Sequence, residues 1–400
     1  MTRTDCNQPV NGEGMNPFLP DSGNMTEKIA NFLAEKRRDT PLLVLDLDLV
    51  VDRYRCLKET LPNVDIYYAI KANPADEVVR ALADEGSCFD IASLPEMDAC
   101  LRLGVGASRL SFGHTIKKER DIARAHSSGL DLFAFDSAGE LEKLARAAPE
   151  SRVFCRLTTK GEGADWPLSK KFGCEVDIAE GLLKRAQQLG LKPHGISFHV
   201  GSQQTDPEQW DVAIAEAAEL FRVLEKVGVK LELINLGGGL PARYLSEVPT
   251  VARYCEAINA SMRKYFGNQM PAMILEPGRG LVGDAGVIQA EVVLVADRHN
   301  GSASRWVYLD IGKFGGLPET IGEAIKYRIR TSRDGGETVP SILAGPTCEE
   351  LDVLYERTPY PLPKDLQVGD RIEIQSAGAY TWSYSAVCFN GIPPLKQYVI

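Results

Sequence analysis

The sequence predicts an α/β protein with an N-terminal (β/α)8 barrel and a C-terminal domain of mostly antiparallel β structure. Between residues 64 and 276, eight short apolar runs alternate with amphipathic stretches and no wide polar gap separates them, which is typical of a barrel. After Gly283 the chain becomes β-rich with little helical pattern. A doubly wound open sheet is disfavoured, because it would carry a glycine fingerprint after its first strand and none is present.

The chain is expected to divide into four segments. Residues 1–24 are rich in Asn, Gly, Pro, Asp and Thr without periodicity, which predicts a flexible tail. Residues 25–50 hold a helical pattern and a strand, and we expect them to join the β domain. The barrel is expected over residues 51–283 and the rest of the β domain over residues 284–400, with a linker near residues 281–286.

Apolar runs bounded by turn signals predict the strands, and period-3.6 patterns between them predict helices. The expected barrel strands are Val64–Ile70, Cys88–Asp90, Leu110–Gly113, Leu132–Phe135, Val153–Leu157, Gly195–Val200, Leu231–Leu236 and Met273–Glu276. The expected β-domain strands are Pro41–Leu45, Val287–Val295, Arg305–Asp310, Ser341–Leu343, Arg371–Gln375 and Ala386–Phe389.

The bulk composition is that of a soluble globular protein. The 400 residues are 44% hydrophobic and 25% charged, enough for about two domains. A net charge of −10 argues against nucleic acid or an anionic membrane as the main partner. No apolar run suits a membrane span or a signal core. Nine scattered cysteines without a C-x-x-C pair predict reduced thiols in the cytoplasm and no metal site.

Lys71 is the most informative single residue. It follows an apolar run and precedes Asn73-Pro74, so it is expected at the C-terminal mouth of a buried strand. Partial removal from water favours the neutral amine, which can form a Schiff base with an aldehyde. A lone lysine at a strand end is more often a simple surface residue, so the other strand ends decide the interpretation.

Further functional groups stand at the ends of the other expected strands, where barrels place their active sites. Three consecutive glycines after the seventh strand expose backbone N–H groups that suit a phosphate, although a tight turn is the commoner reason for such a triplet. The residues at these strand ends are Asp90, Arg156, His199, Ser202, Gly237, Gly238, Gly239, Glu276, Gly278 and Arg279.

Two of these residues suit a pyridine ring. Glu276 beside a ring nitrogen would keep that nitrogen protonated, so that the ring can accept electrons. The alternative is that Glu276 forms a structural ion pair. His199 could stack on the ring, although a single histidine is more often a satisfied core residue. With Lys71 and a phosphate cradle, these groups meet the requirements of pyridoxal 5′-phosphate (PLP).

The chain resembles the fold-type III PLP-dependent decarboxylases of the ornithine/lysine/arginine family, from about residue 26 onward. Its Asp-Ile-Gly-Lys-Phe-Gly-Gly and Glu-Ala-Ile-Lys-Tyr segments look closest to the short bacterial ornithine decarboxylases. The resemblance implies an alanine racemase-like barrel and a homodimer with shared active sites. The other matching segments are Tyr-Ala-Ile-Lys-Ala-Asn, Phe-Asp-Ile-Ala-Ser, Ser-Phe-His-Val-Gly-Ser, Leu-Gly-Gly-Gly, Glu-Pro-Gly-Arg, Gly-Pro-Thr-Cys, Gly-Ala-Tyr-Thr and Phe-Asn-Gly.

The resemblance also implies a role for each matching residue. Lys71 would hold PLP, and Glu276 would pair with its ring nitrogen. Cys348, from the partner subunit, would protonate the α-carbon, although a lone cysteine is usually a small apolar residue. Phe314 and Phe389 would line the substrate site. The ring would be surrounded by Asp90, Arg156 and His199, and the phosphate bound by Ser202, Gly238, Gly239, Gly278, Arg279 and Tyr380.

In this family, two acidic residues bind the far amino group of the substrate. One corresponds to Glu319 or Glu323, of which Glu323 fits better by position. The other is normally Asp, and here it is Glu349. The extra methylene moves the carboxylate by about 1.5 Å, and one misfitted methylene is worth about 1–3 kcal/mol. Trp382 adds bulk near the phosphate side, unless it is a core or interface residue.

The resemblance implies decarboxylation of a basic L-amino acid, first L-ornithine to putrescine. Because of Glu349, lysine, 2,4-diaminobutyrate or a specialised-pathway substrate stays open as the alternative. A racemase is disfavoured, because such enzymes typically place Arg at the position of Glu276. A non-catalytic relative would show decay at Lys71, His199, Glu276 or Cys348, and all four are present. A PLP-binding single barrel is disfavoured by the β domain.

Overall fold

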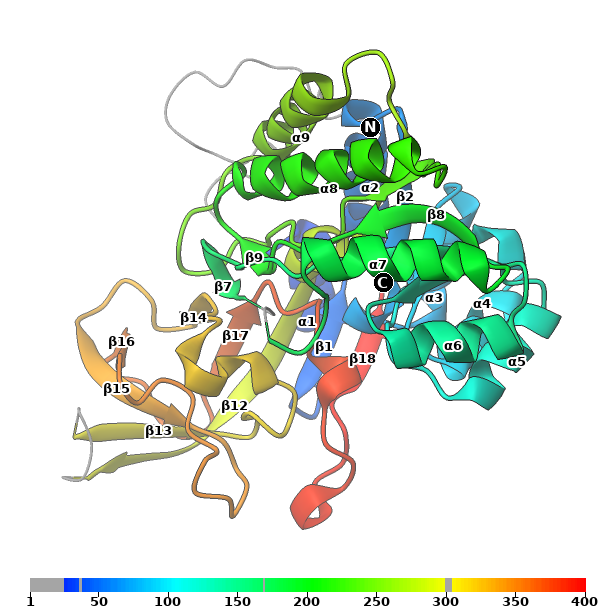
Figure 1. The fold of residues 1–400 in the computed structure, drawn as a ribbon. Helices are drawn as coiled ribbons and strands as arrows, with labels where there is room; N and C mark the ends of the chain where they lie inside the picture. Colours follow the sequence, from blue (N-terminus) through cyan, green and yellow to red (C-terminus); the bar gives the residue numbers. More distant parts are fainter. Residues whose placement is uncertain (1–24, 36–37, 168–169, 299–303) are drawn as a thin grey trace. The chain divides into compact units, whose positions relative to one another are not determined.

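The computed structural model describes residues 25–35, 38–167, 170–298 and 304–400, so the tail predicted over residues 1–24 lies outside the described residues. The described chain forms two compact units (Figure 1). The barrel unit comprises Val51–Pro241 and Val248–Gly280. The β unit comprises the described residues before Val51, the short segment Ala242–Glu247, and Leu281–Ile400.

The barrel unit contains a closed barrel of eight parallel strands, as the sequence predicts. Parallel strands are covered on both faces, which is why they appear in the sequence as short continuous apolar runs. In barrel order the strands are β10 (Leu233–Asn235), β11 (Ala272–Leu275), β2 (Val64–Ala69), β3 (Cys88–Ile91), β4 (Leu110–Phe112), β5 (Leu132–Phe135), β6 (Arg152–Arg156) and β8 (Lys192–Ser197).

Amphipathic helices connect these strands. Helix α3 is typical, because it buries Val78, Val79 and Leu82 while its polar residues face outward. The helices are α2 (Leu47–Thr60), α3 (Asp76–Asp84), α4 (Leu94–Arg102), α5 (Glu119–Ser127), α6 (Ala138–Ala147), α7 (Val176–Gln188), α8 (Gln209–Lys226), α9 (Val251–Phe266) and the short α10 (Arg279–Val282). A small antiparallel pair, β7 (Ala164–Trp166) with β9 (Ser202–Gln204), was not expected from the sequence.

The interior of the barrel is filled with side chains. One buried cluster joins residues from five strands: Tyr67, Leu132, Ala134, Phe154, Leu233 and Ile274. A packed interior leaves the carboxyl ends of the strands as the place for function. No helix in the described part of the chain is both long and apolar enough to cross a bilayer.

The β unit is built on an eight-stranded, mostly antiparallel sheet. Strand β1 (Leu42–Leu45) lies antiparallel to the long β12 (Gly286–Asp297) and parallel to β18 (Lys396–Val399). Helix α1 (Glu27–Glu35) buries Ile29 against β1. The remaining strands are β13 (Arg305–Leu309), β14 (Ile329–Thr331), β15 (Thr338–Ala344), β16 (Tyr360–Pro363) and β17 (Arg371–Gln375).

The strand predicted over residues 386–389 is wrong. Cys388 and Asn390 have φ angles of 57° and 52°, which extended backbone does not allow. The segment therefore bends into the short 3-10 turn Phe389–Gly391.

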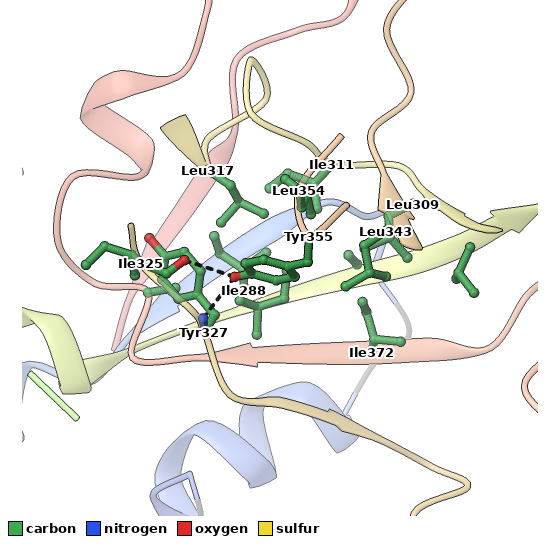
Figure 2. Close-up of a cluster of buried hydrophobic side chains, with 14 of the residues drawn as sticks. Ile288, Leu309, Ile311, Leu317, Ile325, Tyr327, Leu343, Leu354, Tyr355 and Ile372 are labelled. Atoms are coloured by element: carbon green, nitrogen blue, oxygen red, sulfur yellow. Dashed lines mark hydrogen bonds between the residues drawn. The ribbon is translucent and has the colours of Figure 1, made fainter. Parts of the chain in front are cut away.

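The core of the β unit packs around a buried tyrosine (Figure 2). The Tyr355 hydroxyl donates to the carbonyl of Ile325 at 3.1 Å and accepts from the backbone N–H of Tyr327 at 2.9 Å. These bonds offset the cost of burying the hydroxyl, since an unsatisfied buried polar group costs about 1–3 kcal/mol. Burial raises the pKa of Tyr355, so the hydroxyl stays protonated and fixes the loop before β14 to the core.

Candidate active site

Lys71 lies two residues beyond the end of β2, in the 3-10 turn Ile70–Ala72 rather than in the strand itself. Its Nζ is 3.1 Å from Oδ2 of Asp90 on β3, whose side chain is 5% exposed. The Lys71 side chain is 49% exposed, so it reaches water more than the sequence interpretation assumed. The Tyr68 hydroxyl donates to the carbonyl of Asn73 at 2.9 Å, which closes the turn that presents the amine.

Glu276 directly follows β11 and reaches the same group of charges. Its Oε1 accepts a hydrogen bond from Nδ2 of Asn235 at 2.5 Å. Burial and, to a lesser extent, the nearby Asp90 carboxylate raise the pKa of Glu276, which is about 7 when all neighbours act together. Lys71, Asn235 and Arg156 act in the opposite direction. A partly buried carboxyl in this balance changes charge near neutral pH, which is the behaviour expected of a functional site.

His199 follows β8 and is neutral. Burial lowers the pKa of His199 well below its usual range, and the positive charges of Arg156 and Lys71 add to this. Its Nδ1 accepts a hydrogen bond from the backbone N–H of Gly201 at 3.0 Å, so the proton of the neutral ring is on Nε2. The ring is therefore an uncharged flat surface rather than a cation.

The predicted phosphate residues come together after β8, β10 and β11. Nη2 of Arg279 donates to Oγ of Ser202 at 3.1 Å. A Cβ on Gly238 would lie 2.7 Å from the carbonyl oxygen of Glu276 and 3.1 Å from Nε2 of His199. Gly239 has a φ of 121°, which only glycine adopts easily. Buried Gly278 directly precedes Arg279. Gly238 and Gly239 leave no room for larger residues, so backbone N–H groups and Arg279 could form an anion site here.

Two residues of this region were missed from the sequence. Asn235, the last residue of β10, is fully buried and bonds Glu276, but Asn before glycines appears in the sequence as an ordinary turn signal. Gly113 has no room for a side chain, since a Cβ there would lie 2.1 Å from Oδ1 of Asp90. Its position as the last residue of the predicted strand Leu110–Gly113 was the only signal.

The predicted substrate residues belong to the β unit. Cys348 is exposed, and its backbone N–H donates to Oδ1 of Asn390 at 2.9 Å. The neighbouring Phe389 ring packs against Phe314 with centroids 5.7 Å apart. The structure thus brings Cys348, Phe314 and the turn around Phe389 together.

The two acidic candidates differ in their surroundings. Oε1 of Glu323 accepts from the backbone N–H of Arg357 at 2.6 Å, and its Oε2 accepts from the Thr358 hydroxyl. Glu349 is exposed. Glu349 therefore has the freer carboxylate for a ligand, whereas Glu323 holds the chain at residues 357–358.

Two further predicted residues also lie in the β unit. Tyr380 has a φ of 55°, a conformation that is uncommon for a bulky side chain and is often found at functional turns. Trp382 packs against the buried core of the unit, as expected of its structural interpretation.

Comparison with known proteins identifies the class. The family described as pyridoxal-dependent decarboxylase, pyridoxal binding domain, matches residues 47–283. A lysine/ornithine decarboxylase of Selenomonas ruminantium is 34% identical over 92% of this chain and 91% of its own length. The chain belongs to the family of pyridoxal-dependent decarboxylases.

Solved structures narrow the class further. The structure described as SrLDC in complex with PLP and cadaverine has a TM-score of 0.84 and 33% identity, and covers 94% of each chain. The arginine decarboxylase of Paramecium bursaria Chlorella virus bound to agmatine also has a TM-score of 0.84, with 30% identity, over 93% of this chain and 99% of that one. The protein is a PLP-dependent amino-acid decarboxylase of the family that acts on lysine, ornithine and arginine.

The residues of the barrel unit fit this cofactor. Lys71 could supply an amine for the aldehyde, and the region of Gly238, Gly239 and Arg279 could supply donors for the phosphate. Glu276, which is partly buried, could supply an acid for the ring nitrogen. Asp90 keeps one oxygen, Oδ1, buried without a hydrogen-bond partner among the described residues. A buried polar atom of this kind is costly unless a ligand completes its bonding.

Proposed function

We propose that this protein decarboxylates a basic L-amino acid in the cytoplasm, with L-ornithine as the first candidate and putrescine as the product. The observation that carries the proposal is the contact of Lys71 with buried Asp90 at 3.1 Å, at the same end of the barrel strands as Glu276. A lysine that can bind the aldehyde and an acid that can pair with the ring nitrogen are the groups that PLP uses in a protein, and Lys71 and Glu276 could supply them.

The proposed mechanism assigns a task to each residue. When bound, PLP supplies an electron sink for the pair of electrons left behind when carbon dioxide departs. Lys71 would hold the cofactor through its amine, which can react with an aldehyde. The ionised Glu276 would keep the ring nitrogen of the cofactor protonated, and the neutral His199 ring would stack on the cofactor ring. Cys348 would then deliver a proton to the α-carbon. A positioned general acid typically raises the rate of such a step by about 10²–10⁴-fold.

We further propose that the active protein is a homodimer in which Cys348 of one subunit serves Lys71 of the other. Support comes from the family resemblance and from the distribution of the predicted site residues between the two units of the chain. The predicted cofactor residues other than Tyr380 lie in the barrel unit, and Cys348 lies in the β unit. An exposed cysteine in a motif of the family has no evident structural purpose within its own subunit.

Mixing two inactive variants tests the shared site. Lys71→Ala and Cys348→Ala homodimers are each expected to be inactive alone. After subunit exchange, half the dimers would be mixed and each would hold one intact site, so activity should return to about a quarter of wild type. Each variant put through the same exchange alone is the control. A mixture that stays inactive would show that both residues serve the same subunit.

Glu349→Asp tests substrate preference. The shorter acid makes room for one more methylene, so kcat/KM for ornithine relative to 2,4-diaminobutyrate should rise about tenfold. Steady-state kinetics with these two amino acids and lysine measure the ratios. The neighbouring exposed Glu350 allows a matched control, Glu350→Asp, which should leave the ratios as in wild type. Unchanged ratios in Glu349→Asp would remove this residue from the specificity argument.

The alternative function is decarboxylation of another amino acid, namely lysine, 2,4-diaminobutyrate or a specialised-pathway substrate. The longer acid at position 349 is the observation that favours it. A panel of amino acids assayed for carbon dioxide release separates the two proposals, since activity confined to a non-basic substrate would contradict the first.

A further inference from the structure

Asn235 is a buried amide with two defined hydrogen bonds. It ends strand β10 and pairs with Ser197 of β8 and Ile274 of β11, so its backbone is fixed from both sides. Its Oδ1 accepts from the backbone N–H of Gly237 at 2.9 Å. Its Nδ2 donates to Oε1 of Glu276 at 2.5 Å. The side chain is fully buried, so water does not compete for either bond.

The orientation of the amide is determined by Gly237. A backbone N–H only donates, so the atom that faces it is the amide oxygen, and the NH₂ group must face Glu276. Gly237 has no room for a side chain: its φ is 66° and a Cβ there would lie 2.0 Å from the carbonyl oxygen of Phe198. The N–H of Glu276 in turn donates to the carbonyl of Gly237 at 2.8 Å. The three residues therefore form one closed set of contacts.

We propose that Asn235 is a positioning residue that keeps Oε1 of Glu276 a hydrogen-bond acceptor and thereby favours the ionised carboxylate that would pair with the ring nitrogen of PLP. The inference deepens the proposed function and rests on it. A donor is needed at this place because the surroundings oppose ionisation. Burial and the Asp90 carboxylate raise the pKa of Glu276, whereas the bond from Asn235 lowers it.

The charged groups around Glu276 come from three other elements. Lys71 follows β2, Asp90 is on β3 and Arg156 ends β6, while His199 after β8 is neutral. None of them is bonded to Oε1 in the described part of the chain. Asn235 is thus the group that specifies which oxygen of Glu276 accepts and which remains for the cofactor.

Asn235→Asp tests this directly, because Asp keeps the size of Asn and can still accept from Gly237. It cannot donate, so it would meet Glu276 only by sharing a proton, as adjacent carboxylates do. The pKa of Glu276 should rise by about one unit or more. The affinity of the apoenzyme for PLP should then fall about tenfold at pH 7 and return toward the wild-type value at high pH. The pH below which kcat falls should also rise by about one unit.

Two further variants keep the test decisive. Asn235→Leu removes the donor without adding charge, and should raise the pH below which kcat falls by less. Gln375→Glu makes the same amide-to-acid change at a buried position on β17 of the β unit, and its pH dependence should match wild type. Thermal denaturation of each variant shows whether it is folded.

The outcomes separate the two proposals. A wild-type protein that neither binds PLP nor releases carbon dioxide overturns the proposed function. In the other case, the wild-type protein binds PLP and releases carbon dioxide, while the Asn235 variants are folded and their PLP affinity follows the wild-type pH dependence. That result overturns only the role of Asn235. A loss by the same factor at every pH also overturns it, because that pattern reports a structural role alone.

Discussion

Lys71→Ala is expected to lower decarboxylation by at least about 10³-fold. The side chain is proposed both to attach the cofactor and to exchange with the substrate amine, and losing an acid–base or nucleophilic group in such a step typically costs about 10²–10⁴-fold. Carbon dioxide release from the best substrate measures kcat/KM. The visible absorbance of the bound cofactor should also change, since the variant can hold PLP only without a covalent bond.

A matched control is available on the outside of the barrel. Lys226 is exposed in the last turn of α8, and Lys226→Ala should retain wild-type activity. Borohydride reduction of wild-type holoenzyme followed by peptide mapping should place the label on the peptide that contains Lys71. A label on another lysine, or a Lys71→Ala variant with more than a tenth of wild-type activity, would contradict the assignment.

Glu276→Gln is expected to lower kcat by about 10²–10³-fold, the usual effect of removing one preorganised charge from a reaction centre. Gln has nearly the same size and can still accept from Asn235, so packing is preserved while the negative charge is lost. KM should change much less than kcat, because the interaction matters most when electrons move into the ring. Equal losses in a conservative control outside the site, such as Glu225→Gln on α8, would contradict this reasoning.

The same substitution predicts a change in the pH dependence of apoprotein stability. The folded-state pKa of Glu276 is raised from 4.5 to about 7, so between these values the folded protein holds a proton that the unfolded chain has released. The contribution of Glu276 to stability is therefore greatest below pH 4.5 and declines as pH rises to about 7, by on the order of 3 kcal/mol. Urea denaturation of both apoproteins at pH 5 and pH 8 should show Glu276→Gln losing less stability than wild type.

The barrel could be predicted because its strands are buried on both faces and stand out as apolar runs. The ends of those runs also located Lys71, Asp90 and Glu276, since functional groups of barrels gather there. Strand boundaries were less predictable. The strand before Lys71 was expected to run to Ile70, but it ends at Ala69, and the backbone then tightens into a 3-10 turn that the Asn73 carbonyl helps to close.

Other features depended on long-range pairing that no local pattern shows. Strand β18 is a short stretch, Lys-Gln-Tyr-Val, whose partner β1 is more than 350 residues earlier in the chain. The role of Asn235 depends on Gly237 and Glu276, which come from different strand ends. The contacts of Glu323 depend on a loop at residues 357–358, so its carboxylate looked freer in the sequence than it is in the fold.

The position of β1 has a consequence for synthesis on the ribosome. This early strand lies between β12 and β18, so it stays unpaired until residues 286–289 have been made, and it gains its second partner only when nearly the whole chain has been made. The barrel residues from Val51 to Gly280 are complete well before that point and can close first, as N-terminal domains generally do during translation. Nascent chains stalled just before residue 396 should therefore carry a folded barrel, with one edge of Leu42–Leu45 still without its β18 partner.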